Sequence, residues 1–235
     1  MQNNRFRHEL KYRISKLEKD ILMARLNCFL ARDVNASQGI YTIRSLYFDD
    51  RWNTAYEEKM MGIANRRKYR IRFYNYSDSV IKLECKNKQG AYIYKESASL
   101  SVQEVKWILA GEYTFLKERS EEICHTFYYQ CVTNMLRPRV IVDYERIPYI
   151  FEPGNVRITF DCELREAELL GDLFDANLPS WKVMEPDELI MEVKYTSMLP
   201  DFIKDILVTQ EAECIAASKY VMCCDHKKER MGILI

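Results

Sequence analysis

Several segments of this chain alternate charged and apolar residues, and this alternation limits the folds open to it. Residues 66–75 (RRKYRIRFYN) carry a basic side chain at every second position from Arg66 to Arg72, with Tyr69, Ile71 and Phe73 in the alternate positions. Side chains two positions apart on a β-strand share a face, so the segment predicts a strand with one cationic and one apolar face. Comparable alternation occurs in residues 5–14, 80–88, 156–165 and 188–196. In residues 156–165 the spacing predicts that four charged side chains share a face: Arg157, Asp161, Glu163 and Arg165.

Helical segments separate these strands. Ser15 and Glu18, and again Ser101 and Glu104, have the spacing of a capping box at a helix N-terminus. Helices are predicted from Ser15, over 52–60, 101–111, 118–135, from Pro200 and over 216–224, and further strands over 41–48, 91–99 and 137–151. Strands joined by short turns predict a largely antiparallel sheet and the α+β class. Without a repeat or a Pro/Gly-rich linker, residues 1–235 are predicted to form a single domain.

A charged strand face has two explanations. On alternation alone, a sheet that is half exposed to solvent is the better one. Two observations favour an enclosed face instead. The amphipathic helices need an apolar surface to cover, which leaves the charged faces together, and facing rows of like charge repel unless an anion or acidic partners compensate them. We therefore predict an antiparallel β-barrel tunnel with a polar, cationic interior, wrapped by helices.

Composition narrows the functions that such an interior could serve. The formal net charge is +0, which gives no reason to expect a nucleic-acid partner. The chain has only seven glycines and no glycine-rich phosphate loop, so phosphate would have to be bound by arginine and lysine side chains. Three scattered histidines argue against a zinc site. With no long apolar stretch and no signal peptide, we expect a cytoplasmic protein.

An ordered series of short motifs resembles the catalytic domain of the vacuolar transporter chaperone (VTC) family, the polyphosphate polymerases. The motifs are Glu9-x-Lys11-Tyr12, Ser45-Leu46-Tyr47-Phe48-Asp49, Arg70-x-Arg72, Glu84-x-Lys86, Tyr144-x-Arg146, Arg157-x-Thr159-x-Asp161, Glu192-Val193-Lys194 and Ser218-Lys219-Tyr220. Each is weak alone, but together they run in order from about residue 5 to residue 221. That family belongs to the triphosphate tunnel metalloenzymes, the CYTH-like superfamily.

The resemblance implies an enzyme that moves the γ-phosphoryl group of ATP onto a growing polyphosphate chain, with Mn²⁺ or Mg²⁺ as cofactor. It implies that Lys219, on the C-terminal helix, is the catalytic residue, and that Glu192 and Glu9 hold the metal. The residues it implies for binding ATP and phosphate are Lys11, Arg70, Arg72, Lys86, Lys95, Tyr144, Arg146, Arg157, Lys194 and Ser218.

The chain departs from the family pattern at two positions. Arg7 stands where the wider superfamily favours a glutamate, and Ala216 stands where the VTC pattern tends to carry a second lysine. Two alternatives therefore stay open: a hydrolase of inorganic or nucleoside triphosphates on the same barrel, and a non-catalytic module that binds polyphosphate. A membrane protein that exports polyphosphate is a candidate partner, which would bring this chain to the inner face of the membrane.

Overall fold

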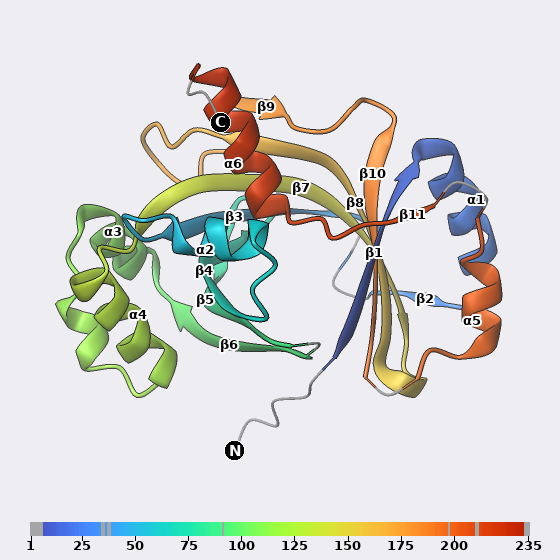
Figure 1. Cartoon of the computed structure of the whole chain (residues 1–235), viewed down its shortest axis with the longest axis horizontal. Helices are drawn as coiled ribbons and strands as arrows, with labels where there is room; N and C mark the ends of the chain where they lie inside the picture. Colours follow the sequence, from blue (N-terminus) through green and yellow to red (C-terminus); the bar gives the residue numbers. More distant parts are fainter. Residues whose placement is uncertain are drawn as a thin grey trace.

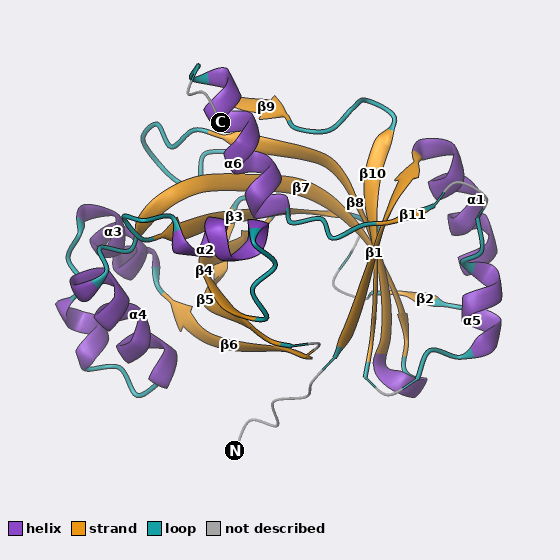
Figure 2. Ribbon diagram, viewed as in Figure 1, coloured by secondary structure: helices purple, strands orange, loops and turns teal. Residues whose placement is uncertain are grey.

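The alternating segments form an 11-stranded antiparallel sheet in the computed structural model, with helices on both of its sides (Figures 1 and 2). The structure describes residues 7–232 except 34, 35, 37, 38, 91, 197, 210 and 211. The strands are β1 (His8–Ser15), β2 (Ala31–Arg32), β3 (Tyr41–Asp49), β4 (Asn65–Tyr74), β5 (Ser77–Gln89), β6 (Tyr92–Leu100), β7 (Arg137–Phe151), β8 (Val156–Ala167), β9 (Ser180–Lys182), β10 (Glu188–Tyr195) and β11 (Glu213–Cys214). The helices are α1 (Lys16–Leu26), α2 (Thr54–Met60), α3 (Val102–Ala110), α4 (Glu122–Thr133), α5 (Asp201–Ile206) and α6 (Lys219–Arg230), with 3₁₀ turns η1 (Thr114–Lys117) and η2 (Pro153–Asn155).

The predicted α+β class and antiparallel sheet are confirmed. Both capping boxes form, with Ser15 at the start of α1 and Ser101 at the start of α3. The helix predicted over 118–135 was too long, because α4 covers only its central part, and the last helix begins and ends later than predicted. Residues 5, 6 and 91 of the predicted strands lie outside the described residues. No helix of the described ranges has the length and apolar character needed to cross a membrane.

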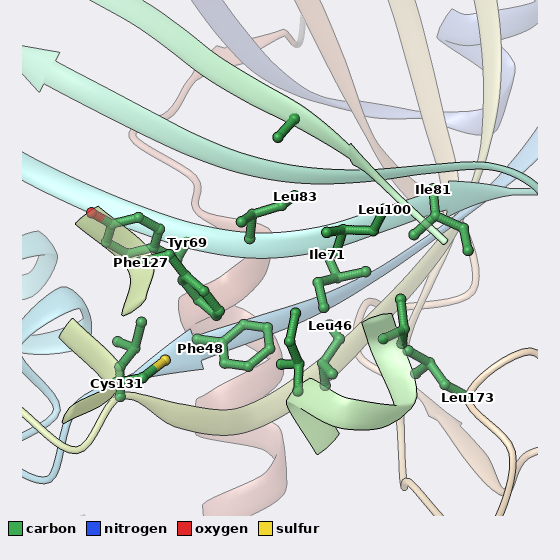
Figure 3. Close-up of a cluster of buried hydrophobic side chains, with 14 of the residues drawn as sticks. Leu46, Phe48, Tyr69, Ile71, Ile81, Leu83, Leu100, Phe127, Cys131 and Leu173 are labelled. Carbon is green, nitrogen blue, oxygen red and sulfur yellow. The ribbon is translucent and has the colours of Figure 1, made fainter. Parts of the chain in front are cut away.

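The outward faces of the strands are apolar and are covered by two groups of helices. On one side, β3, β4 and β5 pack Leu46, Ile71 and Leu83 against α3 and α4, where Phe127 is fully buried (Figure 3). On the other side, α1 and α5 cover the apolar faces of β1, β8 and β10. Burial of these side chains stabilises the fold and holds the strands with their charged faces on the opposite side.

The sheet runs in the order β11-β1-β10-β8-β7-β3-β4-β5-β6 and curves strongly (Figure 1). Its two sides approach where Arg7, just before β1, forms an isolated antiparallel bridge with Ile93 of β6. Lys86 on β5 also donates hydrogen bonds of 2.9 and 3.0 Å to Glu9 on β1. Within the part of the chain that the structure describes, one bridge joins these sides, so a continuous closed barrel stays a prediction.

A β-bulge on β8 overturns one prediction about its charged face. The register with β7 shifts between Asp143 and Glu145, and Glu163 adopts a left-handed backbone conformation with φ of 51°. An extra residue in one strand turns every later side chain to the opposite face. Glu163 and Arg165 therefore do not share the face of Arg157 and Asp161. Glu163 instead pairs outside with Lys182, at 2.7 Å.

Helix α6 lies over β7 and β8 and contacts α2, and its first turn carries Lys219 (Figure 1). At this end the Tyr220 hydroxyl donates to Asp49, whose carboxylate also caps α2 by accepting from the backbone amide of Ala55. At the far end, the fully buried Glu166 accepts hydrogen bonds from Arg230 at 3.2 and 3.3 Å. The same shift of register that displaced Glu163 turns Glu166 toward the helix, so the bulge on β8 fixes the helix that carries Lys219.

We predict that Glu166→Ala loosens the C-terminal half of α6. Hydrogen bonds between charged groups contribute about 1.5–3 kcal/mol each, so the free energy of unfolding should fall by about 2 kcal/mol in urea titration. Amide hydrogens of residues 226–230 should exchange faster. The control is Glu168→Ala, because Glu168 is only partly buried and lies 3.5 Å from the same Arg230 guanidinium. Equal exchange in both variants would show that Glu166 does not anchor the helix.

Candidate functional site

The charged strand faces border one cavity of about 810 Å³. Side chains reach it from β1, β3–β8 and β10, from α2 and from the first turn of α6. Every residue that the sequence singled out for a site lines this cavity: Glu9, Lys11, Arg70, Arg72, Lys86, Lys95, Tyr144, Arg146, Arg157, Glu192, Lys194, Ser218 and Lys219. The structure therefore brings the predicted residues together, while their chemical roles stay predictions.

The lining of this cavity is strongly cationic, although the chain as a whole has a formal net charge of +0. Fourteen lysines and arginines face two glutamates, which leaves a formal excess of twelve positive charges. Three carboxylates just behind the lining, those of Asp33, Glu84 and Asp161, pair with lining cations and reduce the excess to nine. A triphosphate has about four negative charges, so the excess positive charge of the cavity could neutralise a longer anion or two separate anions.

Glu84 neutralises the wall formed by β4, β5 and β6. Its carboxylate lies 2.6 Å from Arg70 and 2.5 Å from Lys95, and Arg72 is 3.9 Å away. Burial alone would raise the pKa of Glu84, but the charges of Arg70, Arg72 and Lys95 hold it well below its usual range. The carboxylate thus stays ionised and fixes the guanidinium of Arg70 along the cavity wall.

A second group of ion pairs surrounds the ammonium of Lys219, which lies 2.5 Å from Asp161 and 2.8 Å from Glu192. Burial favours the neutral amine, but the two carboxylates outweigh it and raise the pKa of Lys219 above its ordinary value. Arg146 donates to both oxygens of Asp161, at 2.6 and 2.7 Å. Lys194, on the same face of β10, donates to Glu192. Lys219 is therefore a permanently charged group held in one position.

Lys11 connects this group to β5. Its ammonium lies 3.4 Å from Glu9 and 3.6 Å from Glu192, and it donates to the Ala217 carbonyl at 2.8 Å. Glu9 in turn accepts from Lys86. Burial lowers the pKa of Lys86 to about 8 even though Glu9 favours its charged form. The two glutamates therefore share one row of ammonium groups across the cavity.

The donor set fits a divalent metal only in part. Mg²⁺ in phosphate-transfer sites is usually held by one or two carboxylates together with phosphate oxygens. Glu192 and Glu9 could supply such ligands. Among the described residues no group of three or more His, Cys, Asp or Glu side chains is arranged to hold a metal. Both glutamates are already paired with lysines. These residues suit a metal that binds together with a phosphate chain.

One region of the lining has cations without carboxylate partners. Lys68 donates to the Ser218 hydroxyl at 2.9 Å, and no carboxylate of the described ranges pairs with it within 4.0 Å. Burial, and then the neighbouring charges of Lys11 and Arg66, lower its pKa to about 7. We name Lys59, Arg66, Lys68 and Lys88 the unpaired lysine–arginine group; none of the four has an ion pair within the described part of the chain. These cations are the ones most free to accept an added anion.

Sequence reasoning missed several residues of the cavity. Arg66, Lys68 and Lys88 lie on strand faces that were identified as charged, so the alternation carried the necessary signal. Lys59 comes from α2, and no strand pattern could have placed it there. The further lining residues without a prediction include the tyrosines Tyr41, Tyr47, Tyr74, Tyr94 and Tyr220.

Comparisons with known proteins agree with this geometry. A search of curated proteins finds no significant match. Among solved structures, this chain is similar to a proposed adenylyl cyclase from Hippeastrum, which is described as having a dominant triphosphatase activity. The TM-score is 0.54 and the sequence identity 14%, and the match covers 98% of this chain and 97% of that one. A proposed adenylate cyclase from Bacillus halodurans has a TM-score of 0.52 and 14% identity, over 97% and 92% of the two chains. At these identities the likeness concerns the fold alone.

The sequence comparison goes further, because the model of one protein family, the VTC domain, matches residues 6–226. This range contains every residue that was predicted for the site and nearly all of the 235 residues of the chain. The resemblance inferred from the short motifs is thus confirmed, and the chain belongs to the VTC-domain family.

Proposed function

We propose that this protein is an ATP-dependent polyphosphate polymerase, which transfers the γ-phosphoryl group of ATP to a growing polyphosphate chain inside a tunnel enclosed by the curved sheet. The observation that carries the proposal is the single cavity with fourteen cationic side chains and two glutamates in a chain of zero net charge. Membership of the VTC-domain family supports it. A cytoplasmic location and a membrane-protein partner for export are part of the same proposal.

In the proposed reaction, a terminal oxygen of the acceptor chain attacks the γ-phosphorus of ATP. The bond from that phosphorus to the β-phosphate oxygen breaks, and ADP leaves with the electron pair. Arg70 and Arg72 bind non-bridging oxygens with guanidinium groups that Glu84 already orients. Lys219, held by Asp161 and Glu192, stabilises the charge on the transferred group. A Mn²⁺ or Mg²⁺ ion held by Glu192 and Glu9 would add charge neutralisation at the phosphate oxygens when bound.

The unpaired lysine–arginine group favours a second phosphate chain as the acceptor. The groups around Lys219 and Glu84 are largely compensated by carboxylates, whereas Lys59, Arg66, Lys68 and Lys88 are not. Like charges held together without compensation are stabilised by a bound polyanion. A water molecule, which attacks in a hydrolase, would gain nothing from these four cations.

One observation favours hydrolysis of triphosphates instead. Ala216 lines the cavity two residues before Ser218, where the VTC pattern tends to carry a lysine. The similar protein from Hippeastrum is described as having a dominant triphosphatase activity. If Ala216 leaves the acceptor too weakly held, water takes its place at the same site. A module that binds polyphosphate without turnover is the third outcome that the experiment below distinguishes.

Our first functional prediction concerns Lys219. The wild-type protein with ATP and Mn²⁺ should form long-chain polyphosphate and ADP in step. Lys219→Ala should lower turnover by about 10²–10³-fold, as does removal of one electrostatic donor from a transition state. The matched control is Arg13→Ala: Arg13 lies two positions after Lys11 on β1 but pairs outside the cavity with Glu188, at 3.6 Å.

Measuring polyphosphate, ADP and free phosphate together separates the candidates. ADP and phosphate without polymer would identify a triphosphatase and exclude the polymerase. Binding of polyphosphate with no turnover would leave the non-catalytic module. Arg13→Ala should match the wild type in every product, and a loss of activity there would make the Lys219 result uninformative about charge in the cavity.

The second prediction concerns chain length. Lys59→Ala with Arg66→Ala should weaken binding of a long polyphosphate by at least ten-fold and leave binding of tripolyphosphate within about two-fold. The affinity for the long chain should also depend less steeply on salt concentration, because fewer cations neutralise it. Fluorescence anisotropy of labelled chains at several salt concentrations measures both effects. A parallel loss for both ligands would place the two cations in the triphosphate site and contradict an acceptor region.

The third prediction concerns pH. In the ligand-free protein the pKa of Lys68 is about 7, lowered by burial and by Lys11, Arg66 and Lys86. A bound phosphate chain favours the charged amine and raises this pKa toward the ordinary 10.5. Affinity for a long polyphosphate is therefore full below pH 7 and falls as pH rises above 7, with uptake of a proton on binding. Calorimetry at pH 8 in buffers of different ionisation heat measures that uptake.

Lys68→Gln should remove most of the proton uptake and leave the smaller contribution of Lys86, whose pKa is about 8. The variant should bind more weakly than the wild type at pH 6 and nearly as well at pH 9, because the wild-type lysine is largely neutral at that pH before ligand binds. Unchanged proton uptake in Lys68→Gln would show that another group takes up the proton when the phosphate chain binds.

A further inference from the structure

Three tyrosines of the cavity accept hydrogen bonds from arginines that were predicted to bind phosphate. The three contacts are Arg70 Nη1 to Tyr47 Oη at 2.8 Å, Arg72 Nη2 to Tyr144 Oη at 3.1 Å, and Arg157 Nη2 to Tyr41 Oη at 3.0 Å. All three phenols line the cavity, and all three tyrosines are buried, at 9%, 3% and 8% exposure respectively. Only Tyr144 was expected in the site from the sequence.

The direction of these hydrogen bonds determines what the phenols can still do. A guanidinium group has donors only, so each tyrosine oxygen is the acceptor and its own O–H hydrogen remains to be donated. Within the described residues, no acceptor receives the O–H hydrogen of Tyr41, Tyr47 or Tyr144. Buried polar groups usually have a partner. Because these hydroxyls border the cavity, a ligand in the cavity can accept from them.

Tyr47 packs against a further aromatic ring as well as against its arginine. Its ring lies 5.1 Å from the ring of Tyr220, and the Arg70 guanidinium lies 5.7 Å from its centre. Burial alone would raise the pKa of the Tyr47 phenol, but Arg70, Arg72 and then Lys219 hold it below its ordinary value. A more acidic phenol is a stronger hydrogen-bond donor toward an anion, and this one is fixed in place before the anion arrives.

We propose that Tyr47 and Tyr41 are phosphate-binding residues, whose hydroxyl groups donate to non-bridging oxygens of a condensed phosphate beside the arginines that orient them. With Tyr144 they form three guanidinium–phenol pairs, each of which offers the anion a charged and a neutral donor. Neutral donors increase the number of hydrogen bonds to a phosphate chain without further repulsion among cations. The inference rests on the proposed function in one respect, that the cavity accepts a phosphate chain.

The test measures tripolyphosphate binding by calorimetry, and melting temperature with and without the ligand. Tyr47→Phe and Tyr41→Phe should each weaken binding by roughly ten-fold, the contribution of one hydrogen bond to a charged group. The melting temperature of the free protein should stay unchanged, while the ligand-induced rise becomes smaller. The control is Tyr74→Phe: Tyr74 lines the cavity and touches Tyr41 edge-on, and no arginine of the described residues donates to it.

Three results are informative. Wild-type protein without any ligand-induced rise would overturn the proposed function and leave the phenols without a ligand. A normal rise in the wild type and in both variants would overturn this inference alone. A loss of affinity in Tyr74→Phe equal to that in Tyr47→Phe would also overturn it, because the effect would then not depend on the arginine–phenol pair.

A fourth measurement separates contact with the ligand from an effect through Arg70. Placing 3-fluorotyrosine at position 47 makes the phenol a stronger donor and a poorer acceptor. With this substitution a phenol that donates to phosphate should bind tripolyphosphate at least as tightly as the wild type at pH 6.5. Weaker binding would show that Tyr47 acts only by accepting from Arg70, as a positioning residue.

Discussion

The rest of this structure depends on the ion pairs that Glu84, Asp161 and Glu192 make with surrounding arginines and lysines. Facing strands with rows of like charge would repel one another in a buried cavity. Each of these carboxylates contacts two or more cations, and each is nearly inaccessible to solvent. A buried charge without a partner is strongly destabilising, so the pairs are needed for the charged faces to lie inside at all.

Carboxylates pair with the cations in one part of the cavity and not in another, and this difference bears on the chemistry of each part. Around Lys219 and Arg70 the side chains are held by carboxylates and are oriented before any ligand arrives, which is the arrangement that stabilises a developing charge most effectively. Around Lys68 no carboxylate of the described ranges lies within 4.0 Å of the cations, and burial lowers the pKa of that lysine to about 7. The first region suits a site for chemistry, and the second suits a site whose charge is completed by the anion that it binds.

Much of this could be predicted from the sequence, because period-two alternation is unambiguous in a strand without interruption. On β4 the alternation of Arg70 and Arg72 with Ile71 gave both faces correctly. On β8 the same rule failed after Asp161, because Glu163 enters a left-handed conformation and reverses the faces. The strands β2, β9 and β11 are two or three residues long, too short to show a period. Lys59 reaches the cavity from a helix, and only tertiary structure brings it there.

The ammonium groups also bear on how a metal and a phosphate chain would bind together. Glu9 and Glu192 are the carboxylates that line the cavity, and Lys11 lies between them. Lys86 contacts both oxygens of Glu9. Lys219 contacts Oε1 of Glu192, and Lys194 donates to its Oε2. A divalent cation that arrives alone would have to displace these lysines and join a region with excess positive charge. A phosphate chain reverses the balance, because it offers the lysines new partners and reduces the excess. Metal and phosphate should therefore each increase the affinity for the other, a coupling that is reciprocal by thermodynamic necessity.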